Sequence, residues 1–170
     1  MRILVTGSSK LAGAIADRFK SDTARVEQDI DFRNYDIFIN NAHVDFEQVY
    51  LFDKCIKAWN RDHSKQIINI SSRAGLPNLS KGLVYGAQKA ALDHMSDNVV
   101  YNSDKLCKVT TINLGMLEDE LPSLKYSEVC DLIQFIISLP KHLEIPRIHF
   151  QHVHNYQHIQ LLKKQRYRNA

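Results

Sequence analysis

Several features that mark other protein classes are missing from this chain. Its 170 residues contain no apolar run of about 18 residues, the length that a membrane-spanning helix needs, so we expect no membrane span. There are only three cysteines, Cys55, Cys107 and Cys130, and their odd number and wide spacing argue against a disulfide framework or a zinc site. We interpret them as reduced core residues and place the protein in the cytoplasm.

Length and composition also limit the number of domains. A chain of 170 residues that is 44% apolar can bury one core but has no room for two. Its first residues lead directly into a strand and a glycine turn, without the charged and apolar regions of a signal peptide. No repeat or low-complexity segment interrupts it. We therefore expect one domain over residues 1–153.

The net charge of +3 is concentrated near the C-terminus. Residues 141–170 carry six Lys or Arg against one acidic residue, and five of the eight histidines. We expect residues 154–170 to form a basic, solvated tail, and we do not expect nucleic-acid binding. His149, His152, His154 and His158 lie near one another but lack nearby carboxylates or cysteines, so we expect no metal site.

Apolar segments with strand and helix character alternate along the chain. Strands are predicted at 2–6, 24–28, 36–40, 66–70, 108–113 and 147–151, and helices at 11–20, 46–61, 84–101, 126–138 and 155–166. This alternation indicates the α/β class, with a doubly wound parallel sheet of about six strands covered on both faces. The polar 24–28 segment suits the edge of the sheet.

Ser72, Tyr85 and Lys89 form the most informative pattern. Tyr85 and Lys89 are i,i+4 neighbours on a predicted helix, and Ser72 ends a predicted strand where open α/β sheets bind ligands. A bare Tyr-x-x-x-Lys match is weak, since roughly half a match is expected by chance in this composition. Tyr50 and Lys54 also match, but no serine accompanies them, so we interpret them as an exposed helical pair.

A glycine turn follows the first strand and opens the first helix. Gly7 and Gly13 bound it, with Ser9 and Lys10 between them, and Leu11 occupies the middle position where a third glycine is common. Such a turn lets a pyrophosphate approach backbone N–H groups at a helix N-terminus. A purely structural strand-to-helix turn is the alternative interpretation.

Four motifs in this order resemble the short-chain dehydrogenase/reductase family: Thr6–Gly13, Asn40-Asn41-Ala42, Asn69–Gly75 and Tyr85–Ala91. The resemblance covers residues 1 to about 153 and implies a Rossmann-type fold with a nicotinamide cofactor. It implies catalytic roles for Ser72, Tyr85 and Lys89. It also implies cofactor contacts from Tyr85 and Lys89, from residues of the first two motifs and from one later glycine: Gly7, Ser9, Lys10, Leu11, Gly13, Asn41, Ala42 and Gly115.

The chain also departs from the family pattern. It is unusually short, and the region between its second and fourth strands is truncated. The family places a catalytic asparagine on the helix predicted here at 46–61, and Glu47 lies nearest that position, so the proton relay toward Lys89 is unfilled. Leu114-Gly115 stands where Pro-Gly is common, and the segment that follows is too short for the usual substrate lid.

The residue types indicate how the site would work. Tyr85 would give a proton to a carbonyl oxygen as hydride arrives, or remove one from an alcohol in reverse. Ser72 would hydrogen-bond the same oxygen, and the Lys89 ammonium would favour the tyrosinate and hold the nicotinamide ribose. Asp29, twenty-two residues after Gly7, favours NAD slightly over NADP, although Lys10 favours NADP.

We therefore predict an NAD- or NADP-dependent oxidoreductase that acts on a small carbonyl or alcohol substrate. The alternative is a dinucleotide-binding module, with a sensing or regulatory role, that turns over little or nothing. We also predict a homodimer or higher homo-oligomer through the 46–61 helix. That helix carries more large apolar residues than one inward stripe requires: Phe46, Val49, Tyr50, Phe52, Ile56 and Trp59.

Overall fold

Six strands form one parallel sheet in the order β2-β1-β3-β4-β5-β6. The structure, a computed structural model, describes residues 1–76, 82–118, 122–157, 160, 161 and 164. The strands are β1 (Ile3–Thr6), β2 (Asp22–Ala24), β3 (Ile37–Asn40), β4 (Gln66–Ser72), β5 (Lys108–Leu114) and β6 (Arg147–Phe150). The helices are α1 (Lys10–Phe19), α2 (Glu47–Trp59), α3 (Leu83–Asn102) and α4 (Tyr126–Ser138), with 3-10 turns η1 (Phe32–Asn34) and η2 (Arg73–Gly75).

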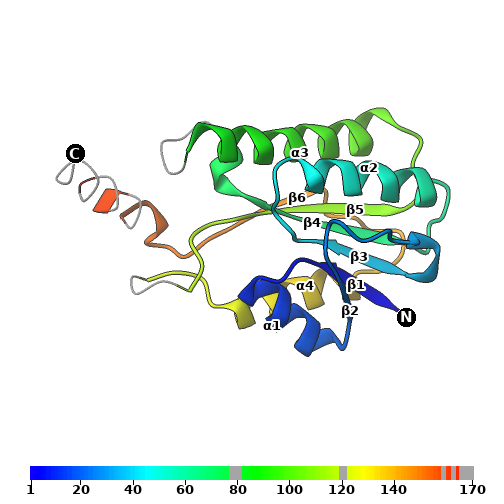
Figure 1. Cartoon of the computed structure of the whole chain (residues 1–170), viewed down its shortest axis with the longest axis horizontal. Coiled ribbons are helices and arrows are strands. Elements are labelled where there is room, and N and C mark those ends of the chain that lie inside the picture. The colour runs from blue at the N-terminus through cyan, green and yellow to red at the C-terminus, as the bar shows by residue number, and fades with distance from the viewer. Residues whose placement is uncertain (77–81, 119–121, 158–159, 162–163, 165–170) are drawn as a thin grey trace.

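The helices cover both faces of the sheet. Figure 1 shows α2 and α3 on one face and α1 and α4 on the other. This arrangement confirms the predicted α/β class with a doubly wound parallel sheet. Among the described residues, no helix is both long and apolar enough to cross a membrane.

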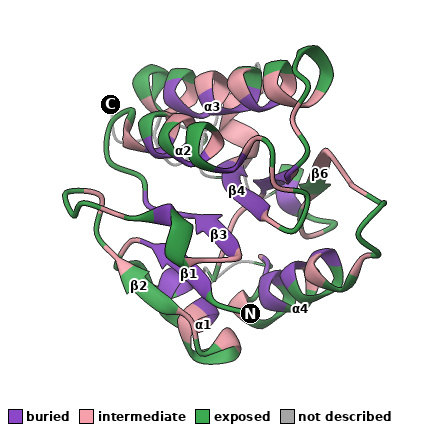
Figure 2. Ribbon diagram, turned by 90° about the vertical axis from the view of Figure 1, so that its right-hand side faces the viewer, coloured by how far each residue is buried: buried purple, intermediate pink, exposed green. Residues whose placement is uncertain are grey.

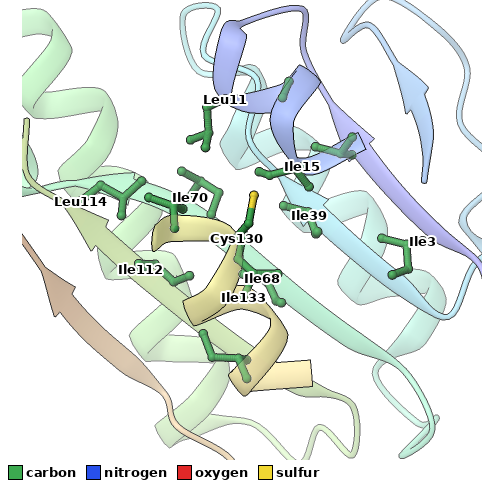
Figure 3. Close-up of a cluster of buried hydrophobic side chains, with 14 of the residues drawn as sticks. Ile3, Leu11, Ile15, Ile39, Ile68, Ile70, Ile112, Leu114, Cys130 and Ile133 are labelled. Carbon is green, nitrogen blue, oxygen red and sulfur yellow. The ribbon is translucent and has the colours of Figure 1, made fainter. Parts of the chain in front are cut away.

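Each face of the sheet has its own apolar core. Ile68 and Ile70 of β4 pack with Leu11 and Ile15 of α1 and with residues of α4 (Figure 3). On the opposite face, Ile67 joins a cluster that holds the fully buried α2 residues Phe52 and Trp59. Successive strand residues point to opposite faces, so the apolar run of β4 serves both cores. Figure 2 shows that the strands between the helix layers are largely buried, whereas the helices expose their outer surfaces.

Two predictions of secondary structure need comment. The strand predicted at 24–28 is wrong, because β2 spans Asp22–Ala24, pairs with β1 and is followed by a turn in which Arg25 N donates to Gln28 Oε1. It is an edge strand, as predicted. In the helix predicted at 155–166, residues 155–157, 160, 161 and 164 are helical, and the others lie outside the described part of the chain.

The parallel topology determines where the candidate site forms. Because every strand runs in the same direction, the segments after β1, β3, β4 and β5 meet at one edge of the sheet. Gly7, Asn41 and Gly115 lie in these segments, and Ser72 is the last residue of β4. Residues that lie far apart in the sequence are thereby gathered around one cavity.

Candidate functional site

The glycine turn after β1 is held by the segment after β3. Gly7 has a φ of 106°, a conformation that side chains disfavour, and a Cβ there would lie 3.1 Å from Ala42 Cα. Asn41 Nδ2 donates to Thr6 O at 3.2 Å and to Ser9 Oγ at 3.3 Å. Ser9 Oγ also accepts from Ala12 N and so caps α1. The turn is therefore rigid and places the N-terminus of α1 at the edge of the sheet.

A cavity of about 800 Å³ runs along this edge. Ten of the predicted site residues line it: Gly7, Ser9, Lys10, Leu11, Asn41, Ala42, Ser72, Tyr85, Lys89 and Gly115. Gly13 lines an adjacent cavity of about 420 Å³, and a Cβ at Gly13 would meet no atom within 4 Å. The open space beside the turn is where a phosphate-bearing ligand would reach the backbone N–H groups, so the residues present fit a dinucleotide.

Asp29 is the predicted site residue that lines neither cavity. The strand before it ends at Ala24, four residues earlier than predicted, so Asp29 is exposed beyond the following turn. Arg25 lies directly after β2 and lines both cavities, and Glu27 lines the larger one. The charged groups nearest this end of the site are therefore Arg25, Glu27 and Lys10.

Ser72 and Tyr85 come together because η2 packs closely on α3. A Cβ at Gly75 would lie 3.0 Å from the carbonyl carbon of Lys89 and 3.1 Å from Ala90 N, so a side chain there would push η2 off the helix. Ser72 precedes η2, and its Oγ accepts from Ala74 N at 3.1 Å. A glycine three residues after the serine therefore allows η2 to pack closely on α3, and this packing brings the end of β4 against the first turns of α3.

Lys89 lines the cavity, although the residue is almost completely buried. Lys89 is 4% exposed, and its Nζ donates to Gln48 Oε1 at 2.5 Å and to Ile70 O at 3.1 Å. Burial lowers the pKa of Lys89 to about 8, although the Asp93 carboxylate opposes this shift. An ammonium has three N–H donors, and these two acceptors leave one for a ligand in the cavity. Nζ also lies 5.8 Å from the Tyr85 ring centroid.

Gln48 is the important residue that the sequence analysis missed. No asparagine occupies the family position on this helix, and Glu47 was placed nearest to it, but the next residue, Gln48, is buried and its amide oxygen accepts directly from Lys89 Nζ. Gln48 Nε2 donates to Asn40 O at 2.8 Å and to Ile70 O at 3.0 Å. Gln48 also lies on the buried stripe of α2 that holds Leu51, Phe52, Cys55 and Trp59. The position of this polar residue on the apolar stripe of the helix was the signal in the sequence that its side chain points inward.

Further buried amides extend this network behind the site. Asn40 Nδ2 donates to Gln48 O at 2.8 Å and to Asn69 Oδ1 at 3.0 Å, and Asn69 Nδ2 donates to Ser96 Oγ at 3.0 Å. Ser96 and Lys89 are both on α3, so the hydrogen bonds link α3, β4, β3 and α2 in a closed path. Such a network resists movement of the ammonium because each displaced group would lose a buried partner.

His43 also lines the cavity, beside Tyr85. The ring centroids of His43 and Tyr85 are 4.7 Å apart with an interplanar angle of 61°, and His43 Nε2 lies 2.9 Å from Gln88 Oε1. Burial, followed by the Lys89 charge, lowers the pKa of His43 below its usual value. The motif analysis did not single out His43, and nothing in its local sequence marks it.

The C-terminal segment closes against Gly115. A Cβ at Gly115 would lie 2.6 Å from Asn155 Oδ1 and 2.7 Å from Gln151 Cβ. Asn155 is 2% exposed, and its Oδ1 accepts from Met116 N at 2.8 Å. Gly115 lines the cavity, but its missing side chain makes room for this segment, so the buried Asn155 packs against the end of β5.

The remaining candidates lie outside the cavity. Tyr50 is 59% exposed, as expected for the second Tyr-x-x-x-Lys match, and Lys54 is also exposed. All three cysteines are buried and free. The described part of the chain has no group of three or more His, Cys, Asp or Glu side chains that could hold a metal ion, and the rings of His152 and His154 lie 5.4 Å apart.

Comparison with solved structures shows which proteins share this fold. Serine dehydrogenase from Escherichia coli is similar at a TM-score of 0.71 and 21% identity, over 90% of this chain and 98% of that one. The fold is that of the short-chain dehydrogenases and reductases. Serine dehydrogenase in its closed form complexed with NADP+ gives a TM-score of 0.73 at 19% identity, over 90% of this chain and 95% of that chain.

A third similar structure broadens the comparison. The 3-ketoacyl-(acyl-carrier-protein) reductase from Brucella melitensis complexed with NADH gives a TM-score of 0.66 at 16% identity, over 88% of this chain and 96% of that one. No protein-family model and no curated protein matches the sequence. These structural neighbours are dehydrogenases and a reductase, and the likeness at these identities is one of fold.

Proposed function

We propose that this protein is an NAD- or NADP-dependent oxidoreductase that interconverts a small carbonyl compound and its alcohol. The observation that carries this proposal is that Ser72, Tyr85 and the buried Lys89 line the same cavity as the glycine turn. A protein that only bound a dinucleotide would not need a serine and a tyrosine at this wall. The fold shared with dehydrogenases and reductases supports the same reaction class.

Each of the three side chains has a distinct role in the proposal. Tyr85 Oη gives its proton to the substrate oxygen during reduction and takes it back during oxidation. Ser72 Oγ accepts from Ala74 N, so its hydroxyl hydrogen is left to stabilise negative charge developing on that oxygen. The Lys89 ammonium, held by Gln48 and Ile70 O, favours the tyrosinate form of Tyr85 electrostatically and offers its third N–H to the ribose.

The dinucleotide would occupy the edge of the sheet from the glycine turn to Tyr85. The backbone around Gly7 and the N-terminus of α1 would bind the pyrophosphate, with Gly13 leaving space beside it. Asn41 and Ala42 would support the middle of the ligand from the end of β3. When bound, the nicotinamide supplies or accepts the hydride.

We propose NADP as the preferred form of the cofactor. The slight preference for NAD came from Asp29, which is not part of either cavity wall, whereas Arg25 lines both cavities and Lys10 lines the larger. A guanidinium near the adenosine ribose suits a 2′-phosphate, and Glu27 opposes it with a single negative charge. One of the reported neighbours is complexed with NADP+ and another with NADH, so the preference for NADP is argued from this chain's own residues.

The proposal is tested by a panel of aldehydes, ketones and alcohols, monitored through the nicotinamide absorbance with both cofactors. Calorimetric titration of each dinucleotide is run in parallel. Turnover of any substrate supports the oxidoreductase. Binding without turnover across the panel favours the dinucleotide-binding module instead, and failure to bind either dinucleotide overturns both.

A homodimer through α2 and a cytoplasmic location remain part of the proposal. Phe52 and Trp59 are in the core, and the exposed aromatic residues left for an interface are Phe46, which directly precedes α2 and is 40% exposed, and Tyr50 on α2, which is 59% exposed. An isologous contact would place each pair against its copy. Light scattering distinguishes the outcomes, since a mass near the monomer's 19.6 kDa that does not change on dilution rules the dimer out.

A further inference from the structure

His43 is a titratable residue of the cavity wall that the proposed roles of Ser72, Tyr85 and Lys89 do not use. It lies shortly after the end of β3, and its ring meets the Tyr85 ring at a centroid distance of 4.7 Å and an angle of 61°. Edge-to-face contact of this kind is a preferred arrangement of two aromatic rings. Among the described residues, His43 is the only aromatic side chain in ring contact with Tyr85.

The His43 ring is itself anchored to the helix that carries Tyr85. Its Nε2 lies 2.9 Å from Gln88 Oε1, and because an amide oxygen only accepts, Nε2 carries the hydrogen in the neutral ring. Gln88 is three residues after Tyr85 on α3 and is 7% exposed, so its position is well defined. His43 therefore contacts α3 at two points, through its ring at Tyr85 and through its hydrogen bond at Gln88, and these two contacts restrict the Tyr85 side chain.

Lys89 cannot supply this support in place of His43. Its Nζ is held by Gln48 Oε1 and Ile70 O and lies 5.8 Å from the Tyr85 ring centroid. It acts on Tyr85 through charge, from the buried side. His43 acts through contact, from the side of the cavity that is open to solvent.

The charge on His43 depends on its neighbours in the described part of the chain. Burial is the largest influence, and the Lys89 ammonium on α3 is the next; both lower the pKa of His43, whereas the Gln88 hydrogen bond and the Asp45 carboxylate, in the loop before α2, raise it. Tyr85, also on α3, faces it with its aromatic ring. His43 is therefore neutral at neutral pH, and in acid it becomes a second cation close to Lys89.

We propose that His43 is a positioning residue for Tyr85: the imidazole, anchored by Gln88, holds the phenol at the cavity wall, and repulsion between the protonated ring and Lys89 weakens this hold in acid. An imidazolium is repelled by Lys89 and better solvated in open water, and these two effects oppose the Gln88 hydrogen bond and the Asp45 carboxylate, which favour the charged ring. The effect on turnover rests on the proposed function. The coupling between the two rings does not.

A pH titration of the full chain by NMR tests the coupling directly, with ¹³C-labelled His and Tyr side chains, with and without NADP. In the wild type, the Tyr85 ring resonances should shift at the same midpoint as His43, below the ordinary histidine value of about 6.5. In His43→Phe, which keeps a ring but cannot titrate, the Tyr85 shift should vanish. The exposed His63 is the matched control, and His63→Phe should retain it.

Gln88→Leu provides a second test that leaves His43 in place. Because it removes the anchor, the Tyr85 and His43 resonances should no longer titrate together. A Tyr85 resonance that does not move between about pH 5 and 7 in the wild type, or that moves equally in His43→Phe, overturns the proposal.

Turnover supplies a separate readout. The wild type should lose kcat/KM for carbonyl reduction in acid with the His43 midpoint, and His43→Phe should lack this acid limb. His43→Ala should lower kcat by about tenfold or more at neutral pH with the KM for the dinucleotide unchanged, and His43→Phe should recover part of the loss. Coupled rings without any turnover would refute the proposed function and support the positioning role. Turnover with uncoupled rings would support the proposed function and refute the positioning role.

Discussion

Replacing Gln48 by leucine should lower the proton affinity of Lys89 in a measurable way. Lys89 Nζ has two acceptors in the described structure, Gln48 Oε1 at 2.5 Å and Ile70 O at 3.1 Å. A hydrogen bond to a charged group contributes about 1.5–3 kcal/mol, and 1.36 kcal/mol corresponds to one pKa unit. Loss of the shorter bond should therefore lower the pKa of Lys89 from about 8 by a further ~1–2 units.

Gln48→Glu is the matched variant with the opposite sign. It keeps the size and shape of the side chain but places a carboxylate beside the ammonium, so the pKa of Lys89 should rise above 8. The assay is an NMR titration of ¹³C-labelled lysine side chains in the full chain, with the Lys89 signal assigned from its absence in Lys89→Arg. If both Gln48 variants leave the Lys89 titration at the wild-type midpoint, Gln48 does not bind the ammonium and the reasoning fails.

Three further predictions follow from other parts of the site. Because the pKa of Lys89 is lowered to about 8 from 10.5, burial of its charge destabilises the fold below pH 8, and this penalty of about 3 kcal/mol is relieved as the pH rises to 10.5. Urea unfolding of wild type and Lys89→Met at several pH values should show this change as a difference between the two proteins, because the buried cysteines, whose pKa values are raised, lower the stability of both as the pH rises. Arg25→Ala should weaken NADP binding more than NAD binding in calorimetry, and Asp29→Ala should change neither; an unchanged ratio in Arg25→Ala contradicts the cofactor assignment. Gly115→Ala should destabilise the chain by about 1–3 kcal/mol in urea, because its Cβ would lie 2.6 Å from Asn155 Oδ1, and a neutral effect would contradict that packing.

The core of the fold could be predicted because its strands are buried on both faces. Apolar runs such as 66–70 lie in β4, where alternate residues enter the two opposite cores. The helix predicted at 126–138 has the observed bounds, since its four buried residues recur at helical spacing. These are local patterns, and each depends only on the residues within the element.

The edge strand β2 was misplaced because its burial pattern carries little information. Asp22 and Thr23 are exposed, and the strand is three residues long, so no alternation marks it. The segment 24–28 offered alternating residues, but its chain turns after Ala24. What fixes β2 is the pairing of Leu4 with Asp22 across the sheet, a contact that the local sequence does not encode.

The position of a site residue could be predicted where a local strand end or helical turn determines it. Contacts between residues that lie far apart in the sequence could not be predicted. Ser72, Tyr85 and Lys89 could be placed in one cavity because a strand end and a helical turn fix them. Gln48 was overlooked in favour of Glu47, although its place on the apolar stripe of α2 could have shown that it points inward. The contact between Gly115 and Asn155 spans forty residues, and the side chain that fills the space at Gly115 cannot be read from the sequence around it.

The most direct test of the proposed chemistry is a single-turnover measurement on a substrate that the wild type reduces, comparing wild type, Tyr85→Phe and Tyr50→Phe. Tyr85→Phe removes only the hydroxyl that would give the proton, so its rate should fall by about 10²–10⁴-fold while dinucleotide affinity stays the same. Tyr50, in the second Tyr-x-x-x-Lys match, is exposed on α2 and should tolerate the same change. Equal rates in the wild type and Tyr85→Phe would contradict the assignment of Tyr85 as the proton donor.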